Sequence, residues 1–327
     1  MQQKKLKVYF TSDVHGYFYP TTYGDMDVKP VGLFGCAADF NKDDETLIID
    51  GGDILQGSAF AYYCRQVANS PEVIADIMND CGYDYYTLGN HDFNYGLDYQ
   101  AAYRNRNNGV CVCQNIMDEE GNTLFPWKLH TMKNGLRIGI AGIVTDYVNI
   151  WEKEENLKGI HITDPFEAAK RALAQMKEQT DLTICIYHGG FECDLESGAV
   201  LSKTTENVGY RICKELDFDI LLTGHQHMSV HGRELFGTYT VQPCDNAKEY
   251  QYLANNSFLL HGYFNYKMVL FGYMEAEQRQ WFLGVPGVFS NQEQLMAGIF
   301  GFPEFRTKQM TRQKTGEFGY WYRFIEI

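Results

Sequence analysis

The chain has 327 residues, of which 45% are hydrophobic and 21% are charged, and its formal net charge at pH 7 is −14. This composition is typical of a globular protein and excludes a largely disordered one. The acidic excess argues against non-specific nucleic-acid binding, which depends on basic side chains that displace counterions from phosphates.

The N-terminal 15 residues contain no long apolar run, so we expect no secretory signal. No apolar run reaches the roughly 18 residues of a membrane-spanning helix.

The nine cysteines are odd in number and scattered, mostly in or beside apolar runs. This pattern favours reduced, buried thiols in a cytoplasmic protein. Cys111 and Cys113 form a C-x-C pair, but no second pair has zinc-site spacing, so we interpret them as structural.

In chain order, apolar runs of strand length alternate with segments of helical period. The runs that predict strands lie at 7–10, 46–50, 83–88, 109–114, 136–144, 182–187 and 218–222. Several are apolar throughout, as expected for strands buried on both faces. Helices are predicted over 70–82, 163–179 and 205–216, and the first two carry a proline in the first turn. The alternation predicts an α/β fold.

The composition changes near residue 250. Residues 251–327 contain 18 aromatic residues, no aspartate, six glutamates and seven basic residues, without a clear strand or helix period. We therefore predict one domain over residues 1–250 and an aromatic-rich tail over 251–327. Three explanations of the tail stay open: a small cap over a site, a packing or dimer-forming element, or a stretch translated after a disruption of the reading frame.

Polar residues follow five of the predicted strands on loops that contain glycine. Each loop alone has a structural explanation as a polar turn, which for the first pair, Asp13 and His15, is the better one when taken in isolation. The coincidence of five such loops favours a common site, because sites in open α/β sheets form at the carboxyl ends of strands. In strand order the residues are Asp13 and His15, Asp53, Asn90 and His91, His188, and His225 and His227.

The order D-x-H, G-D, G-N-H-D, H-G and G-H-x-H, spread over about residues 5–250, resembles the binuclear metallophosphoesterase superfamily. More closely, it is similar to the branch of 5′-nucleotidases and 2′,3′-cyclic-nucleotide phosphodiesterases. The resemblance implies a four-layer sandwich of two sheets flanked by helices, with residues 1–250 as the catalytic domain. It also implies two divalent metal ions, one held by Asp13, His15, Asp53 and His227, and the other by Asp53, Asn90, His188 and His225.

The residue types suit such ions, because carboxylates and imidazoles bind Mn²⁺, Fe²⁺, Zn²⁺ and Co²⁺, among which the sequence does not choose. Two ions roughly 3.5–4 Å apart would activate a water molecule and hold the phosphoryl oxygens. The resemblance implies that His91, outside both metal shells, faces the phosphate. There it would stabilise developing charge or protonate the leaving oxygen.

Two features depart from the pattern of the branch. Its nucleotidases usually carry an aspartate three residues after this histidine, whereas this chain has Asn94. Asn94 can still accept a hydrogen bond from the His91 imidazole, but it lacks the negative charge. The nucleotidases also carry a larger C-terminal domain that binds base and phosphate. The tail cannot be matched to it, so we assign no substrate-binding residues there.

The sequence therefore predicts a cytoplasmic, metal-dependent phosphoric ester hydrolase of nucleotide catabolism, a 5′-nucleotidase-like monoesterase. The alternatives are a 2′,3′-cyclic-nucleotide phosphodiesterase and a non-catalytic metal- or nucleotide-binding remnant, which Asn94 and the unmatched tail would fit. A phosphodiesterase acting on nucleic-acid ends is disfavoured by the acidic charge. We expect a small phosphate ester as partner, neither nucleic acid nor membrane, and leave open a homo-oligomer through the tail.

Overall fold

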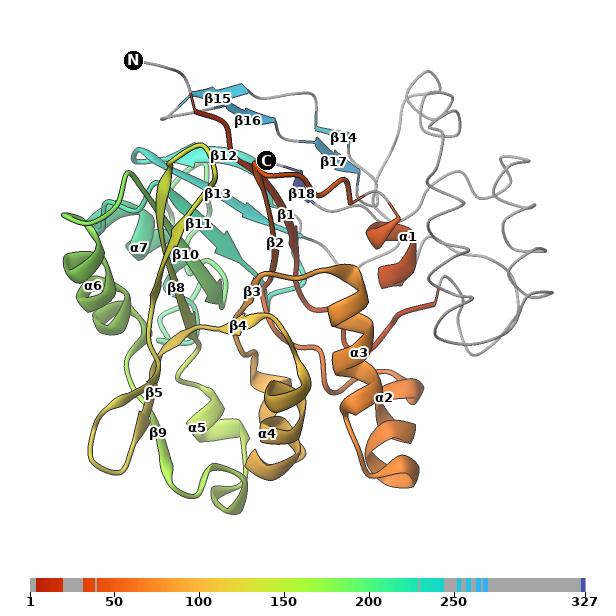
Figure 1. Ribbon diagram of the computed structural model, residues 1–327. Coiled ribbons are helices and arrows are strands. Elements are labelled where there is room, and N and C mark those ends of the chain that lie inside the picture. The colour runs from red at the N-terminus through yellow and green to blue at the C-terminus, as the bar shows by residue number, and fades with distance from the viewer. Residues whose placement is uncertain are drawn as a thin grey trace.

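The computed structural model describes residues 4–19, 32–38, 40–228 and 230–243, with five short strand segments at 252–253, 257–259, 263–265, 267–269 and 325–326. Two main sheets face each other in the middle of the molecule, and helices lie outside them (Figure 1). Within the described residues, no helix has both the length and the apolarity needed to cross a bilayer.

The first sheet has the strand order β14-β17-β18-β1-β2-β3-β4. Its centre is parallel: β1 (Lys7–Thr11), β2 (Thr46–Asp50), β3 (Tyr85–Tyr86) and β4 (Val110–Cys111). On the other side of β1 the sheet continues antiparallel through β18 (Ile325–Glu326), β17 (Lys267–Val269) and β14 (Tyr252–Leu253). β15 (Ser257–Leu259) and β16 (Tyr263–Asn265) pair separately.

The second sheet has the order β12-β13-β11-β10-β8-β7. Its parallel strands are β13 (Thr238–Gln242), β11 (Ile220–Thr223), β10 (Leu182–His188) and β8 (Arg137–Val144), and its antiparallel edges are β12 (Val230–Leu235) and β7 (Lys128–Thr131). A small third sheet contains β6 (Thr123–Phe125), β5 (Cys113–Asp118) and β9 (Ile160–Ile162).

The helices are α1 (Leu33–Ala37), α2 (Ala59–Tyr63), α3 (Glu72–Cys81), α4 (Leu97–Arg106), α5 (Val148–Trp151), α6 (Pro165–Met176) and α7 (Gly209–Glu215). Short 3₁₀ segments lie at Asn90–Phe93 and Glu154–Leu157, and a π-turn follows α2 at Cys64–Ala68. The helix predicted over 163–179 is α6, in which the Asp164 side chain accepts a hydrogen bond from the Glu167 backbone N–H and Pro165 occupies the first turn as expected.

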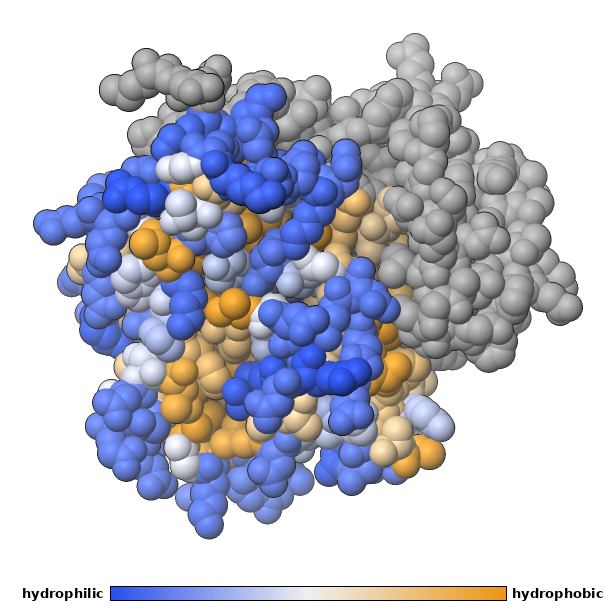
Figure 2. Space-filling view, viewed as in Figure 1, coloured by the Kyte–Doolittle hydropathy of each residue, from blue (hydrophilic) through white to orange (hydrophobic). Residues whose placement is uncertain are grey.

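Successive side chains along the strands of the second sheet point to opposite faces, so an apolar layer lies on each side of this sheet. Ile138 and Ile140 of β8 pack in the cluster shared with the first sheet, whereas Ala141 and Ile143 pack in the cluster that contains α6 and α7. Both faces of the sheet are therefore covered, which explains its continuous apolar strands. Hydrophilic residues cover much of the face shown in Figure 2, with hydrophobic residues visible between them.

Two predicted elements are wrong in part. The single strand expected over 109–114 is two strands, because the chain leaves the first sheet after Cys111 and enters the third sheet at Cys113. Cys111 and Cys113 therefore do not share one strand face. The helix expected over 205–216 begins only at Gly209, since residues 205–208 form a loop whose backbone bonds to neighbouring side chains. The predictions about the tail fall almost entirely outside the described residues.

Candidate metal centre

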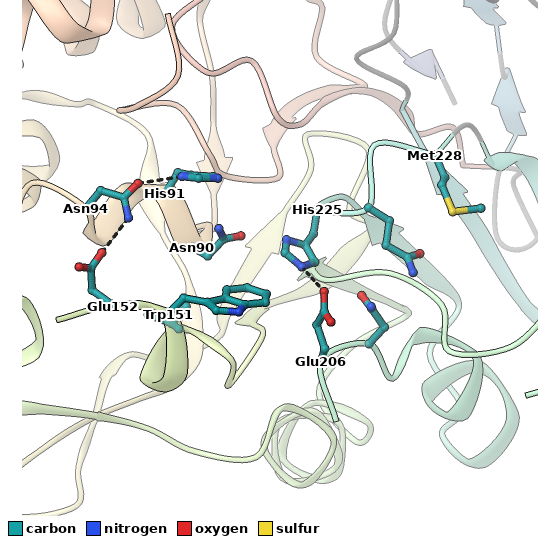
Figure 3. A pocket seen from close by; sticks show the side chains of 11 residues that line it. Asn90, His91, Asn94, Trp151, Glu152, Glu206, His225 and Met228 are labelled. Atoms are coloured by element: carbon teal, nitrogen blue, oxygen red, sulfur yellow. Dashed lines mark hydrogen bonds and ion pairs between the residues drawn. The ribbon is translucent and has the colours of Figure 1, made fainter. Parts of the chain in front are cut away.

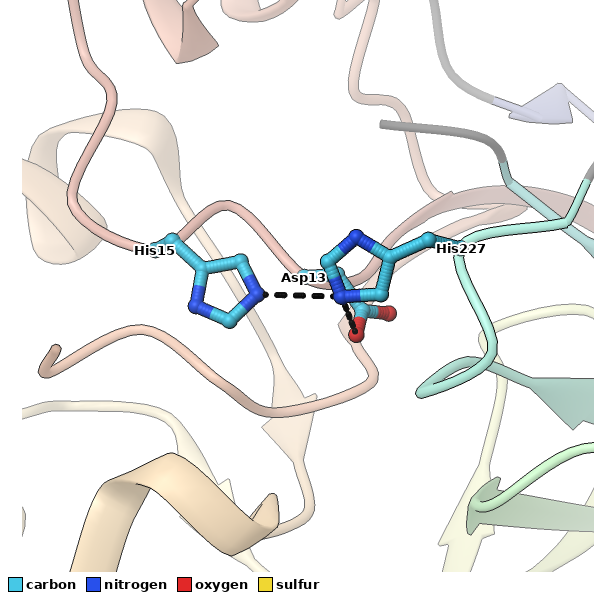
Figure 4. Close-up of side chains that lie close together, drawn as sticks. All are labelled: Asp13, His15 and His227. Carbon is cyan, nitrogen blue, oxygen red and sulfur yellow. Dashed lines mark hydrogen bonds and ion pairs between the residues drawn. The ribbon is translucent and has the colours of Figure 1, made fainter. Parts of the chain in front are cut away.

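The five predicted loops lie at the carboxyl ends of central strands in the two main sheets. β1, β2 and β3 are parallel in the first sheet, and β10 and β11 are parallel in the second, so their carboxyl ends carry the predicted residues to a common place. Two groups of ligand atoms result, each with all its atoms within 4.8 Å of one another. One group is Asp13, His15 and His227 (Figure 4), and the other is Asp13, Asp53 and His188.

The backbone at these positions is unusual. Seven described non-glycine residues have positive φ, and five of them are predicted ligands, with φ from 52° to 70°. Left-handed backbone is uncommon for residues with a Cβ atom, although Asp and His tolerate it better than most. Such strain clusters at functional sites, where the surrounding structure holds it. The five residues are Asp13, His15, Asp53, His225 and His227.

Two glycines allow the loops to approach this closely. A Cβ atom on Gly89 would lie 2.2 Å from Asp53 Oδ1 and 2.6 Å from His188 Cε1. A Cβ atom on Gly224 would lie 2.6 Å from Asp13 Oδ2. All three distances are far below van der Waals contact, so any larger residue at either position would push the loops apart.

His15 points a lone pair into the centre. Its Nδ1–H donates to the Gln56 carbonyl at 2.8 Å, which leaves Nε2 unprotonated in the neutral ring. That Nε2 lies 3.3 Å from His227 Nε2 and 3.8 Å from Asp53 Oδ2. An imidazole that donates its second N–H to a backbone carbonyl is typical of metal-ligating histidines.

His188 has the same arrangement at the second group. Its Nδ1 donates to the Gly51 carbonyl at 2.7 Å, and its Nε2 lies 3.2 Å from both Asp53 Oδ2 and Asn90 Oδ1. Burial opposes a charge on this ring, but the adjacent Asp53 carboxylate raises the His188 pKa above its ordinary value. Three lone-pair atoms facing one another require a cation or a proton between them, so this donor set fits a divalent metal ion.

Asp53 is placed to serve both groups. Its Oδ1 accepts the His91 backbone N–H at 2.7 Å, which leaves Oδ2 facing the imidazoles of His15 and His188. The two compact groups themselves share Asp13, whereas the resemblance implies Asp53 as the shared ligand. Asp13 also accepts the His225 backbone N–H, at 3.0 Å, and so ties a loop of the second sheet to one of the first.

Two carboxylates that organise the centre are not among the predicted site residues. Glu206 accepts a hydrogen bond from His225 Nε2 at 3.1 Å, which leaves Nδ1 as the lone-pair atom of His225. Asp92, the last residue of the GNHD motif, is buried and accepts four backbone N–H groups, from Gly89 and from residues 53–55. Asp92 could have been found from its position in the GNHD motif, whereas nothing in the sequence marks Glu206.

His91 lies beside the metal groups, with its ring centroid 5.2 Å from that of His15. Its Nδ1 lies 2.7 Å from Asn94 Oδ1, so the expected hydrogen bond between these two residues is present. Asn94 Nδ2 in turn donates to Glu152 Oε2 at 2.7 Å (Figure 3). Glu152 was not predicted, since nothing in the sequence connects residue 152 with residue 94.

A cavity of about 670 Å³ opens beside the centre. Its lining includes Asn90, His91, Trp151, Glu152, Glu206 and His225. Trp151 is 48% exposed, and its ring lies 5.4 Å from the His225 ring, centroid to centroid, at an interplanar angle of 31° (Figure 3). The described residues that line the cavity include two glutamates and no lysine or arginine.

A family model described as calcineurin-like phosphoesterase matches residues 6–229. The chain belongs to this family. The chain is 29% identical over 252 residues to the trifunctional nucleotide phosphoesterase protein YfkN of Bacillus subtilis, covering 69% of this chain and 17% of that protein. It is also 29% identical over 233 residues to the 5′-nucleotidase of Vibrio cholerae, covering 69% and 41% of the two chains.

Solved structures agree with this assignment. A candidate 5′-nucleotidase from Staphylococcus aureus, crystallised with alpha-ketoglutarate, superposes with a TM-score of 0.72 at 30% identity, covering 89% of this chain and 58% of that one. The calcineurin-like phosphoesterase YfkN from Bacillus subtilis gives 0.64 at 25% identity, covering 74% and 82%. The expected superfamily and its α/β sandwich are confirmed. The phosphoesterase spans less than half the length of the two curated relatives above.

A second family model, described as a family of unknown function (DUF6128), matches residues 244–325. A stretch that such a model describes recurs in other proteins, which argues against a disrupted reading frame as the origin of the tail. The homo-oligomer through the tail, which the sequence leaves open, has no support in the described residues or in these similarities. The division near residue 250 stays a prediction.

Proposed function

We propose that this phosphoesterase is a divalent-metal-dependent hydrolase of nucleotide phosphate esters. The main support is that five of the seven predicted ligands, Asp13, His15, Asp53, His188 and His227, supply two groups of ligand atoms that each lie within 4.8 Å of one another. His15 and His188 each donate one ring N–H to a backbone carbonyl and turn the other nitrogen toward Asp53. Asp13, His15 and His227 would hold one ion, Asn90, His188 and His225 the other, and Asp53 would contact both. Such ions, when bound, stabilise charge on phosphoryl oxygens and lower the pKa of water.

The protein's own residues would bind and orient the ester. Asn94 accepts from His91 Nδ1, so His91 Nε2 is the ring atom available to the substrate. When Nε2 also carries a proton, so that the ring is an imidazolium, it can donate a hydrogen bond to a phosphoryl oxygen or a proton to the leaving oxygen, a contribution typically worth about 10²–10⁴-fold in rate.

The cavity supports a substrate with one phosphoryl group and an aromatic base. Trp151 offers an exposed ring on which a base could stack. Glu152 and Glu206 would repel a second or third phosphate, and the described lining has no lysine or arginine to compensate. We therefore propose nucleoside monophosphates as substrates, in preference to di- and triphosphates.

Cyclic nucleotides are the second candidate substrate. Besides the 5′-nucleotidase, a relative from Yersinia enterocolitica named 2′,3′-cyclic-nucleotide 2′-phosphodiesterase/3′-nucleotidase is 29% identical over 241 residues. A panel of 5′-nucleotides, 2′,3′-cyclic nucleotides and a bis-aryl phosphodiester, assayed with several divalent ions, separates these two candidates. The cytoplasmic location stays a prediction, compatible with free thiols at all eight cysteines in the described part of the chain.

Hydrolysis of an aryl phosphate tests the proposed function. With Mn²⁺ supplied, the wild-type protein should hydrolyse the aryl phosphate, and Asp53→Asn should reduce kcat by about 10²-fold or more. His91→Ala should reduce kcat by a similar factor for a nucleoside monophosphate, whose leaving oxygen needs a proton. His161→Ala is the control, because this exposed histidine lies on β9, outside the centre. Wild-type levels of turnover in Asp53→Asn would refute the assigned site, and absence of turnover in the wild type with every ion would favour the non-catalytic alternative.

A further inference from the structure

We propose that Glu152 is a positioning residue for His91, acting through the side-chain amide of Asn94. This inference rests on the proposed function, since it concerns the orientation of a group that would act on the ester. The three side chains form one chain of hydrogen bonds, with 2.7 Å between His91 Nδ1 and Asn94 Oδ1 and 2.7 Å between Asn94 Nδ2 and Glu152 Oε2 (Figure 3).

The carboxylate determines which way the amide faces. The oxygen and nitrogen of an asparagine side chain are nearly interchangeable in shape, so hydrogen-bond partners decide its orientation. An ionised Glu152 can only accept, so Asn94 must turn its NH₂ group toward it and its oxygen toward His91. That oxygen in turn requires a proton on His91 Nδ1. Glu152 thereby selects the ring tautomer that presents Nε2 to the cavity.

Glu152 is itself held in place on its other side. Its Oε1 accepts hydrogen bonds from Asn156 Nδ2 at 2.9 Å and from the Lys153 backbone N–H at 2.8 Å. Asn156 Nδ2 also lies 3.2 Å from the Asn94 carbonyl oxygen, which links the segment after α5 to the loop that carries His91. Both carboxylate oxygens of Glu152 are thus engaged, and one of them faces the amide.

This arrangement accounts for the departure at residue 94. The resemblance implies a carboxylate in direct contact with the histidine, whereas here an amide separates them. Compared with the pattern that the resemblance implies, the negative charge lies one side chain further out, at Glu152, and the Asn94 amide connects it to His91. The pair Asn94 and Glu152 would replace the single aspartate.

Exchanging the two groups tests this pairing. In Asn94→Asp alone, two carboxylates would face each other across the 2.7 Å contact and repel. In Glu152→Gln alone, the new amide can both donate and accept, so the orientation of Asn94 is no longer fixed. In the double variant that combines Asn94→Asp with Glu152→Gln, the carboxylate at position 94 would accept from both His91 and the amide at position 152. That exchange restores one charge and both hydrogen bonds.

We expect each single variant to lower kcat on a nucleoside monophosphate by roughly 10–100-fold with little change in KM, the usual range for a residue that orients an active-site group. The double variant should return to within about threefold of wild type, because the two changes compensate. On p-nitrophenyl phosphate, whose leaving group needs no proton, the single variants should lose about threefold or less. Glu154→Gln, which removes a neighbouring exposed charge, should change neither rate.

Equal losses on both substrates, or a double variant no better than Asn94→Asp, would overturn the inference while leaving the hydrolase intact. If no ester is hydrolysed at all, the proposed function fails, and ¹⁵N spectra of the histidines then test the positioning directly. The metal-free wild type should show the Nδ1–H tautomer at His91, assigned with His91→Ala, and Glu152→Gln should show a mixture. An unchanged tautomer in Glu152→Gln would contradict the inference.

Discussion

Trp151 is the side chain on which the proposed preference for nucleotides depends. Its exposed ring borders the cavity, and loss of base stacking should cost about 1 kcal/mol, or about fivefold in KM. We expect Trp151→Ala to raise KM for a nucleoside monophosphate by that factor and to leave KM for glycerol phosphate within about twofold. Trp151→Phe should have a KM for the nucleoside monophosphate between those of the wild type and Trp151→Ala. Parallel increases on both esters would show that the ring only supports His225.

The sequence predicted some of the site residues and gave no indication of others. All seven predicted ligands lie in motifs at strand ends, where residue type and neighbouring glycines mark them without knowledge of the fold. Glu152 and Glu206 could not be predicted, because each contacts its partner from a segment that is distant in sequence: Glu152 reaches Asn94, and Glu206 reaches His225. Their roles depend on tertiary contacts that no spacing encodes.

The carboxyl end of β2 carries a buried acid outside the metal groups. Asp50 accepts hydrogen bonds from Thr11 Oγ1 at 2.8 Å and from the Gly52 backbone N–H at 3.0 Å. Burial raises the Asp50 pKa from 3.8 to about 8. The folded protein therefore keeps a proton that the unfolded chain releases, so the wild type should lose stability as the pH rises from about 4 to about 8.

Asp50→Asn removes this pH dependence. Its amide can donate to Thr11 Oγ1 and accept from the Gly52 N–H, so both hydrogen bonds survive. We expect the free energy of unfolding of the variant, relative to wild type, to increase by a few kcal/mol between pH 4 and pH 8. Urea unfolding in the presence of EDTA measures this difference. A difference that stays constant with pH would indicate an Asp50 that is ionised in the folded protein.

At the level of elements, long periodic segments were predictable and their interruptions were not. α6 was recognisable from Asp164, Pro165 and its apolar stripe. The strand expected over 109–114 has uniform β character, yet it divides where the chain passes between sheets. The helix expected from 205 starts late, because Asn207 Oδ1 accepts the Gly190 backbone N–H and holds this stretch as a loop. In both cases tertiary contacts override local preference.

The whole molecule brings the centre together from two sheets. Asp13 follows β1 of the first sheet, and His225 follows β11 of the second, so their contact exists only once the sheets have packed. The order of the motifs predicted this meeting through the family resemblance, whereas periodicity alone indicated only an α/β fold. The tail contains none of the five motifs, and the match of residues 244–325 to a family of unknown function assigns them no role.

Anomalous diffraction from crystals of the Mn²⁺-loaded protein would locate the cations directly. We predict two peaks, one bounded by Asp13, His15 and His227 and the other by Asn90, His188 and His225, with the Asp53 carboxylate in contact with both. One peak alone, or peaks away from Asp53, would contradict the dinuclear centre on which the proposed hydrolysis depends.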